Sequence, residues 1–162
     1  MASAYQRAEF WGFDFHKPSI ETCSARAAEA GLGDRAHFEV ATAKDYKGTF
    51  DLICFFDCLH DMGDPVGIAR YAREHLAPDG TVMLVEPFAL DGRAANLSQN
   101  PMAAMLYLAS TAICTPNSLS QEVGLGAQAG EARLRSIFEQ AGFTRFRRAF
   151  ETRLNLILEA RP

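Results

Sequence analysis

An apolar run that ends in a cluster of polar residues constrains the fold of this chain more than any other feature. Residues 50–56 read FDLICFF, a pattern that predicts a strand buried on both faces, as found inside a parallel sheet. The polar residues Asp57, His60 and Asp61 follow this strand at once. Because ligands of open parallel sheets bind beyond the carboxyl ends of the strands, we expect the functional site at this strand end.

Strands and helices alternate along most of the chain. The predicted strands cover residues 9–14, 38–41, 50–56 and 81–85, and the predicted helices cover residues 18–30, 65–76, 100–114 and 134–141. The helix over 100–114 is apolar almost all round and must be covered. Residues 1–7 are predicted to be a short helical piece, and residues 77–80 a turn. Residues 91–99 form a polar stretch, and residues 115–130 a loop.

Two further strands close the chain, at residues 143–151 and 154–160. The connection between them is so short that they must pair antiparallel. Together with the strand–helix alternation, this predicts an α/β fold: a Rossmann-like, doubly wound and mostly parallel sheet with a C-terminal antiparallel hairpin.

Composition narrows the class of protein. With 48% hydrophobic and 22% charged residues, the chain can form one core, and we expect a single domain over residues 1–162. The net charge of -4 argues against a nucleic-acid surface, and Arg145, Arg147 and Arg148 indicate a solvated strand face. No apolar run reaches transmembrane length and no signal peptide is visible, so we expect a cytoplasmic protein with reduced cysteines and no membrane partner.

No metal site is expected from the spacing of the cysteines. Cys54, Cys58 and His60 form a Cys-x3-Cys-x-His pattern across a strand end, without a second pair of ligands. Packing explains the two thiols better.

The ends of the predicted strands carry the candidate functional residues. Asp14 ends the first strand, where a carboxylate can accept both ribose hydroxyls of a nucleoside, and Phe15 can pack on its base. Thr42 and Ala43 end the next strand, where backbone N–H groups can meet a base edge or form a simple loop.

His60 is the candidate general base for a hydroxyl or amine, because its reference pKa is near neutral. Asp61 or Asp57 can orient the ring, and the alternative is a structural histidine in the turn around Gly63. Glu86 ends the strand over 81–85, where it either contacts substrate or satisfies backbone N–H groups.

These residues and motifs resemble class I S-adenosylmethionine-dependent methyltransferases. The segments that carry the resemblance are Gly12-Phe13-Asp14, Ala41-Thr42-Ala43, Phe50-Asp51-Leu52-Ile53, Leu59-His60-Asp61 and Leu76-Ala77-Pro78-Asp79-Gly80-Thr81. The terminal hairpin also fits, since that family ends its sheet with an antiparallel strand. The resemblance extends over nearly all of the chain.

The resemblance implies S-adenosylmethionine as cofactor and assigns residues to it. Asp14 matches the acid that holds the ribose, and Phe15 matches the residue beside the adenine. The remaining cofactor positions are Thr42 and Ala43 near the base, and Phe56 and Asp57 near the methionine part.

The resemblance also implies the reaction. His60 and Asp61 are similar to the His-Asp pair of plant-type small-molecule O-methyltransferases, in which the histidine is the base. We therefore expect methyl transfer to a small-molecule oxygen or nitrogen, with the helix over 100–114 as one wall of the acceptor pocket.

One part of the family pattern is absent before Asp14: the first strand and its glycine-rich loop. We therefore expect the C-terminal portion of a methyltransferase domain that binds S-adenosylmethionine weakly or not at all by itself. Its partners would be the small-molecule acceptor and either a missing N-terminal segment or a second copy of the chain.

Two alternatives stay open from the sequence. The first is a non-catalytic fragment or half-domain that needs a partner chain, which a titration with S-adenosylmethionine distinguishes. The second is a nicotinamide-dependent Rossmann oxidoreductase, because Asp14 can serve NAD equally well. Binding of NADH, followed by fluorescence, tests it.

Overall fold

The computed structural model describes all of residues 1–162, which form two compact units, residues 1–47 and residues 48–162. The prediction of a single domain over the whole chain stays a prediction.

The first unit is a two-stranded parallel sheet with one helix packed against it. Its elements are β1 (Phe10–Asp14), α1 (Lys17–Glu29) and β2 (Ala36–Val40). The strands pair in register from Phe10 and Ala36 to Asp14 and Val40, so both carboxyl ends lie at one edge. Residues 1–7 were predicted to be helical but form turns. The Arg35 guanidinium donates hydrogen bonds to the carbonyl oxygens of Ala2 and Tyr5, which are then not used within a helix.

The second unit contains a four-stranded sheet in the order β3-β4-β6-β5. In chain order its elements are β3 (Phe50–Phe56), the 3-10 helix η1 (Leu59–Asp61), α2 (Pro65–Glu74), β4 (Leu76–Pro87), α3 (Arg93–Gln99), α4 (Ala103–Ala109), the π-helical segment η2 (Ser110–Cys114), α5 (Thr115–Gln121), α6 (Gly130–Gln140), β5 (Arg145–Glu151) and β6 (Asn155–Arg161). β3 and β4 are parallel, and β6 is antiparallel to both β4 and β5, which confirms the predicted terminal hairpin.

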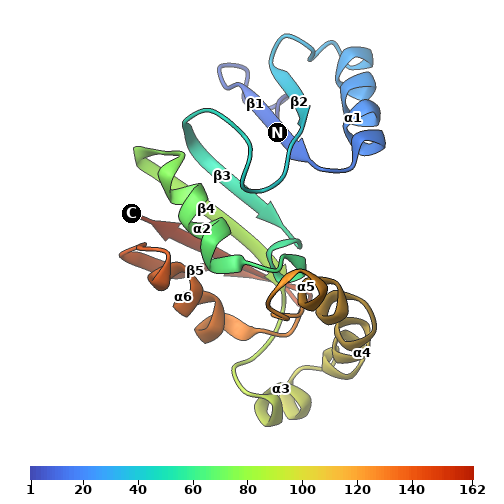
Figure 1. The fold of residues 1–162 in the computed structure, drawn as a ribbon, viewed down its shortest axis with the longest axis vertical. Coiled ribbons are helices and arrows are strands. Elements are labelled where there is room, and N and C mark those ends of the chain that lie inside the picture. Colours follow the sequence, from blue (N-terminus) through green and yellow to red (C-terminus); the bar gives the residue numbers. More distant parts are fainter. The chain divides into compact units, whose positions relative to one another are not determined.

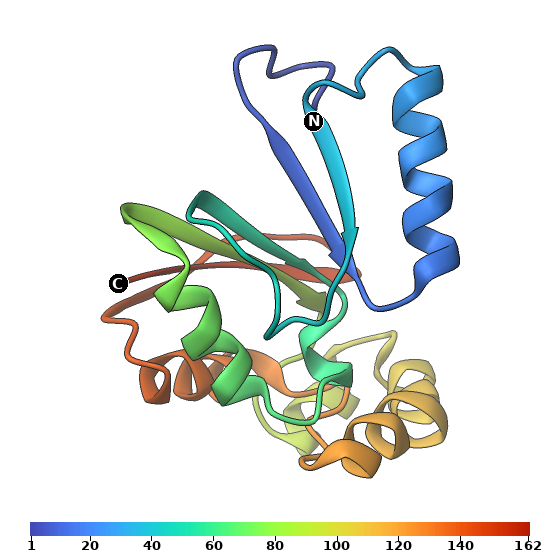
Figure 2. The same cartoon turned by 45° about the horizontal axis from the view of Figure 1, so that its top comes forward.

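The core of the second unit lies on one face of its sheet. Figures 1 and 2 show α2 and α6 side by side on that face, with α3, α4 and α5 gathered near the carboxyl end of β4. Alternate residues of β4 and β6 point to this face, and Val82, Leu84, Leu156 and Leu158 are buried there. The residues buried on the facing helices include Ile68 and Ala72 of α2 and Leu134 and Phe138 of α6. The sheet therefore brings the ends of β3 and β4 to the same edge, beside α5.

The prediction that β3 is buried on both faces is wrong. Only Phe55 of this strand is buried, and Leu52 and Phe56 are 44% and 56% exposed. The helices α2 and α6 cover only one face of the sheet. An uninterrupted apolar run such as that of β3 therefore does not show whether one or both faces of the strand are buried.

The Leu-x-Pro-x-Gly segment lies inside β4 rather than before it. Phe50 pairs with Leu76 and Leu52 pairs with Thr81, so residues 77–80 form an irregularity opposite Asp51. Gly80 fits there because a Cβ atom would lie 2.9 Å from Ala77 O and 3.1 Å from Phe50 O.

Two helices lie where none was predicted. The polar stretch 91–99 contains α3, and the predicted loop over 115–130 begins with α5, which continues from η2 without a break. Pro116 is tolerated in the first turn of α5, so it does not end the helix. No helix in the structure combines the length and apolar character needed to span a membrane.

A buried amide network ties the exit of β4 to α3. Asn96 is fully buried; its Oδ1 accepts a hydrogen bond from Leu90 N–H at 3.1 Å, and its Nδ2 donates to Gln128 Oε1 at 2.8 Å. Asn100 Nδ2 donates to Asn96 Oδ1 at 3.0 Å and to Phe88 O at 3.1 Å. This network fixes the chain between Glu86 and α4.

Asn96→Ala is expected to destabilise the second unit. The substitution leaves buried donors without partners, and each costs about 1–3 kcal/mol in the free energy of unfolding. Urea denaturation measures the loss. Ser98→Ala in the same helix is the control, because Ser98 is exposed and should change stability by less than about 0.5 kcal/mol. Equal midpoints for both variants would contradict the role of the network.

Candidate functional site

The chain leaves β3 through a residue in an unusual backbone conformation. Asp57 is the one non-glycine residue with a positive φ, at 47°. Aspartate adopts this left-handed conformation more readily than most residues. Asp57 N–H donates to Val85 O at 2.9 Å, and the Asp57 carboxylate accepts from Asn155 Nδ2 at 3.0 and 3.3 Å. These bonds hold the turn against β4 and β6.

The turn continues into η1, which carries the candidate base. Leu59 is fully buried and anchors η1 in the core, and His60 beside it is only 4% exposed. On the neighbouring strand, Glu86 follows Val85, the partner of Phe56 in the parallel register. The ends of β3 and β4 therefore bring His60 and Glu86 to one place.

Glu86 binds both the backbone and the ring at this strand end. Its Oε1 accepts a hydrogen bond from Leu59 N–H at 3.0 Å, and its Oε2 lies 2.5 Å from His60 Nδ1. A carboxylate can only accept, so Nδ1 carries the proton and Nε2 holds the free lone pair of the neutral ring. Nε2 lies 3.5 Å from Asp61 Oδ1.

Burial and charge shift the pKa values of this pair. Burial raises the pKa of Glu86, and its hydrogen bond to His60 offsets part of that effect. Burial works to lower the pKa of His60, but the hydrogen bond and negative charge of Glu86 outweigh it, and the pKa of His60 is raised. The imidazole is thus a stronger base than a free one, which suits proton abstraction.

Two thiols near this pair are kept protonated. Burial, followed by the charge of Glu86, raises the pKa of Cys58 to about 12. Burial, followed by the neighbouring Asp61 carboxylate, raises the pKa of Cys114 to about 11. Neither thiol is therefore a ready nucleophile at neutral pH.

The segment after η2 is bonded directly to the His60 turn. Val123 N–H donates to Gly63 O at 2.8 Å, and Asn117 Nδ2 donates to Asp61 O at 3.2 Å. Gly63 is buried in this contact, where a Cβ atom would lie 2.4 Å from Gln121 Cβ and 2.8 Å from Glu122 N. Glycine at position 63 therefore allows α5 to approach the His60 turn.

Gly63→Ala is expected to lower the free energy of unfolding by about 1–3 kcal/mol, as overpacking usually does. The backbone of Glu122 cannot yield cheaply to the new methyl group. Gly33→Ala is the matched control, because nothing lies within 4 Å of a Cβ atom at Gly33. Thermal unfolding of the two variants measures the difference, and a Gly63→Ala midpoint equal to that of Gly33→Ala would show that the contact has no energetic weight.

The structure places the predicted site residues in two groups. In the second unit, Asp57, His60 and Asp61 follow β3, and Phe56 ends it. His60 and Asp61 lie close together, whereas Asp57 pairs with Asn155 rather than with the imidazole. The prediction that Asp61 or Asp57 orients His60 missed Glu86 as the partner of Nδ1.

In the first unit, the predicted cofactor residues share one sheet edge. Asp14 ends β1, and its carbonyl oxygen accepts from Ala41 N–H at 3.1 Å, next to Thr42 and Ala43. The Asp14 carboxylate is exposed and accepts from His16 N–H at 2.8 Å, and Phe15 is 78% exposed. Their roles in cofactor binding stay predictions.

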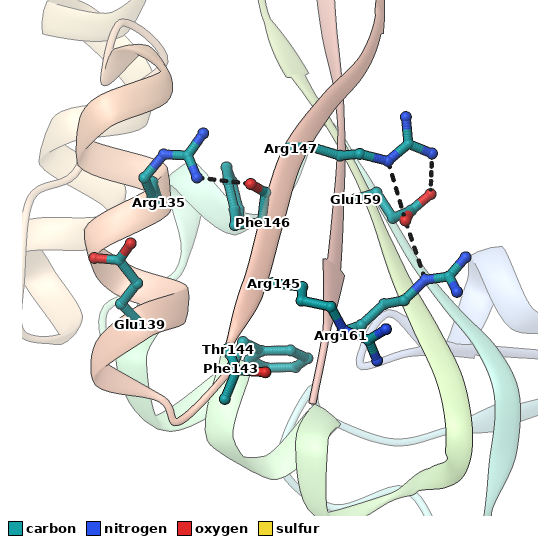
Figure 3. Close-up of a pocket in the computed structure, with 9 residues that line it drawn as sticks. All are labelled: Arg135, Glu139, Phe143, Thr144, Arg145, Phe146, Arg147, Glu159 and Arg161. Atoms are coloured by element: carbon teal, nitrogen blue, oxygen red, sulfur yellow. Dashed lines mark hydrogen bonds and ion pairs between the residues drawn. The ribbon is translucent and has the colours of Figure 1, made fainter.

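A cavity of about 450 Å³ lies at the opposite end of the second unit's sheet, between the end of α6 and the hairpin (Figure 3). Four charged residues of its lining have partners: Arg147 and Arg161 contact Glu159 at 2.6 and 3.0 Å, and Arg135 donates to Phe146 O at 2.6 Å. In the register, Val82 pairs with Ala160 here, whereas Glu86 pairs with Leu156 at the other end. The cavity is therefore at the amino end of β4, away from His60.

The fold matches that of known proteins. A family model described as a methyltransferase domain matches residues 1–142. An O-methyltransferase family 2 protein of Planctomyces limnophilus, solved in complex with apigenin, has a TM-score of 0.75 at 17% identity, over 99% of this chain and 45% of that chain. The O-methyltransferase NcsB1 of neocarzinostatin biosynthesis, solved with S-adenosyl-L-homocysteine and 1,4-dihydroxy-2-naphthoic acid, has a TM-score of 0.68 at 21% identity, over 98% and 43%.

A third structure, the methyltransferase CalO6, has a TM-score of 0.65 at 26% identity, over 99% of this chain and 51% of that chain. The chain thus spans about half the length of the solved structures it matches. The predicted Rossmann-like α/β fold is confirmed, and so is the methyltransferase resemblance. Since one family model covers residues 1–142 and the same fold extends over almost all of the chain, this chain belongs to the methyltransferase domain family.

Proposed function

We propose that this domain transfers a methyl group from S-adenosylmethionine to a hydroxyl oxygen of a small molecule, with His60 as general base. The observation that carries the proposal is the pairing of His60 Nδ1 with Glu86 at 2.5 Å, which leaves Nε2 as the proton acceptor. Family membership in a methyltransferase domain supports this function over the dehydrogenase alternative.

The residues of the first unit fit the adenosine part of the donor. Asp14 offers an exposed carboxylate that accepts from His16 N–H, and its oxygens can also accept from ribose hydroxyls. The exposed ring of Phe15 can stack on adenine. The donor, when bound, supplies a methyl group that its sulfonium has already activated.

The chain's own contribution is to orient the acceptor and remove its proton. Glu86 fixes the ring, so that Nε2 can take the hydroxyl proton as the oxygen bonds to the methyl carbon. The exposed apolar side chains of α4 and η2, Met105, Leu108 and Ile113, support an acceptor with a large apolar part. Two similar structures were solved with polycyclic hydroxylated molecules, apigenin and 1,4-dihydroxy-2-naphthoic acid.

A methyl-transfer assay tests the proposal. The protein is incubated with methyl-labelled S-adenosylmethionine and a panel of hydroxylated aromatic acceptors, including the two molecules above, beside matched acceptors that carry amines or thiols. We expect label on an acceptor oxygen and formation of S-adenosylhomocysteine. Label on nitrogen alone, or oxidation of NADH without methyl transfer, would contradict the proposed function.

A further inference from the structure

Three potential metal ligands converge on the side of His60 that faces away from Glu86. They are His60 Nε2, Asp61 Oδ1 and Cys114 Sγ, and all three atoms lie within 4.8 Å of one another. His60 and Asp61 come from η1, and Cys114 is the last residue of η2. The pattern of cysteine spacing could not reveal this group, because Cys114 is far from His60 in sequence.

The histidine of this group is held as metal-binding histidines commonly are. A metal-bound imidazole usually donates its other N–H to a carboxylate, which fixes the ring and its tautomer. Here Glu86 Oε2 accepts from Nδ1, and the lone pair of Nε2 points to the side of Asp61.

The aspartate of this group has an unsatisfied oxygen. Asp61 Oδ1 is buried and makes no hydrogen bond of normal geometry, and its 3.5 Å contact to His60 Nε2 is longer than a typical hydrogen bond. Buried polar oxygens are rarely left in this state. A cation between the three atoms would satisfy Oδ1 and use the Nε2 lone pair at once.

The backbone around the group is fixed from both sides. Asn117 Nδ2 donates to Asp61 O, and Val123 N–H donates to Gly63 O, so the helix that follows Cys114 is tied to the turn that carries His60. The three ligands are therefore held near one another before any ion arrives, which lowers the cost of assembling a site.

The donor set selects the metal. Magnesium and calcium take oxygen ligands, whereas a nitrogen, an oxygen and a sulfur ligand together are typical of zinc. Zinc bonds of about 2.0–2.3 Å in a tetrahedral site put ligand atoms roughly 3.3–3.8 Å apart, so a contraction of about 1 Å from the 4.8 Å limit suffices. Three protein ligands also leave a fourth position open.

We propose that His60 Nε2, Asp61 Oδ1 and Cys114 Sγ form a Zn²⁺ site with one position open to water. Binding replaces the thiol proton of Cys114 with the metal and releases that proton to solvent. A consequence that rests on the proposed function is that zinc inhibits methyl transfer, because the Nε2 lone pair cannot bind zinc and accept a proton at the same time.

Metal binding by the 162-residue chain tests the site without donor or acceptor. Zn²⁺ is added to the wild-type protein at alkaline pH, where a measurable fraction of each thiol is ionised, and alkylation of each cysteine by iodoacetamide is followed by mass spectrometry. We expect zinc to slow the alkylation of Cys114 selectively, with Cys23, Cys54 and Cys58 as internal controls. An unchanged rate at Cys114, or equal slowing at all four thiols, would overturn the proposal.

Variants then test the ligand set. Titration with Co²⁺ is expected to give a thiolate-to-cobalt charge-transfer band that Cys114→Ser abolishes and the matched Cys58→Ser retains. Glu86→Gln should weaken Zn²⁺ affinity about 10–100-fold, as loss of an outer carboxylate does. A band that survives Cys114→Ser, or is lost in Cys58→Ser, would overturn the assignment. Because these readouts involve no methyl transfer, their failure is distinct from failure of the proposed function.

Discussion

His60→Ala is expected to lower the rate of methyl transfer by a factor of about 10²–10⁴, the usual contribution of a general base. Without the imidazole, the position of Nε2 holds no base, and the nearest carboxylate oxygen, Asp61 Oδ1, lies 3.5 Å from that position. The affinity for S-adenosylmethionine should change little, because the ring addresses the acceptor. The measurement is turnover of labelled donor by a form of the protein that binds S-adenosylmethionine.

The matched control for this experiment is His75→Ala. His75 is the C-cap of α2, where its Nδ1 lies 2.9 Å from Tyr71 O, far along the sheet from the ends of β3 and β4. We expect that variant to keep the wild-type rate at a temperature where it is folded. If His60→Ala also keeps the wild-type rate, His60 is a structural residue of the turn.

Glu86→Ala is expected to lower both turnover and stability. Without the carboxylate, Leu59 N–H and His60 Nδ1–H both lose their acceptor, and each unsatisfied buried donor costs about 1–3 kcal/mol in the free energy of unfolding. The imidazole would lose the contact that fixes its tautomer, so turnover should fall nearly as far as in His60→Ala. Chemical denaturation and the labelled-donor assay measure the two effects.

A double-mutant cycle separates the two roles of Glu86. If Glu86 acts on catalysis through His60, the double variant His60→Ala/Glu86→Ala should turn over at the rate of His60→Ala alone. Glu86→Gln keeps an acceptor for Leu59 N–H and should recover most of the stability while turnover stays low. Rate losses that multiply in the double variant would show that Glu86 acts independently of His60.

The sequence predicted the parts of the fold that depend on local signals. Asp64 and Pro65 mark the start of α2, and the Asp64 side chain does accept from Gly67 N–H at 2.8 Å. The hairpin at the C-terminus followed from the short connection between its strands. The burial of β3 was mispredicted, because the number of faces covered depends on where α2 and α6 pack, and no local pattern records that.

The candidate site was predicted only in part for the same reason. His60 and Asp61 are adjacent in sequence and follow an apolar strand, so the sequence alone identified them as candidate site residues. Glu86 was noticed at a strand end, but its pairing with His60 depends on the parallel register of β3 and β4. Cys114 reaches the site because α5 and the residue Val123 after it are bonded to the turn at Asp61 and Gly63, a contact between segments far apart along the chain.

The central claim is that Glu86 holds a proton on His60 Nδ1 and leaves Nε2 free to accept the proton of a hydroxyl group. Nitrogen-15 NMR of the histidine side chains tests it most directly, at a pH where the His60 ring is neutral. The claim predicts a protonated Nδ1 with a strongly downfield hydrogen-bonded proton, an unprotonated Nε2, and an upfield shift of that proton in Glu86→Gln. A His60 ring protonated at Nε2, with a spectrum that Glu86→Gln leaves unchanged, would contradict it.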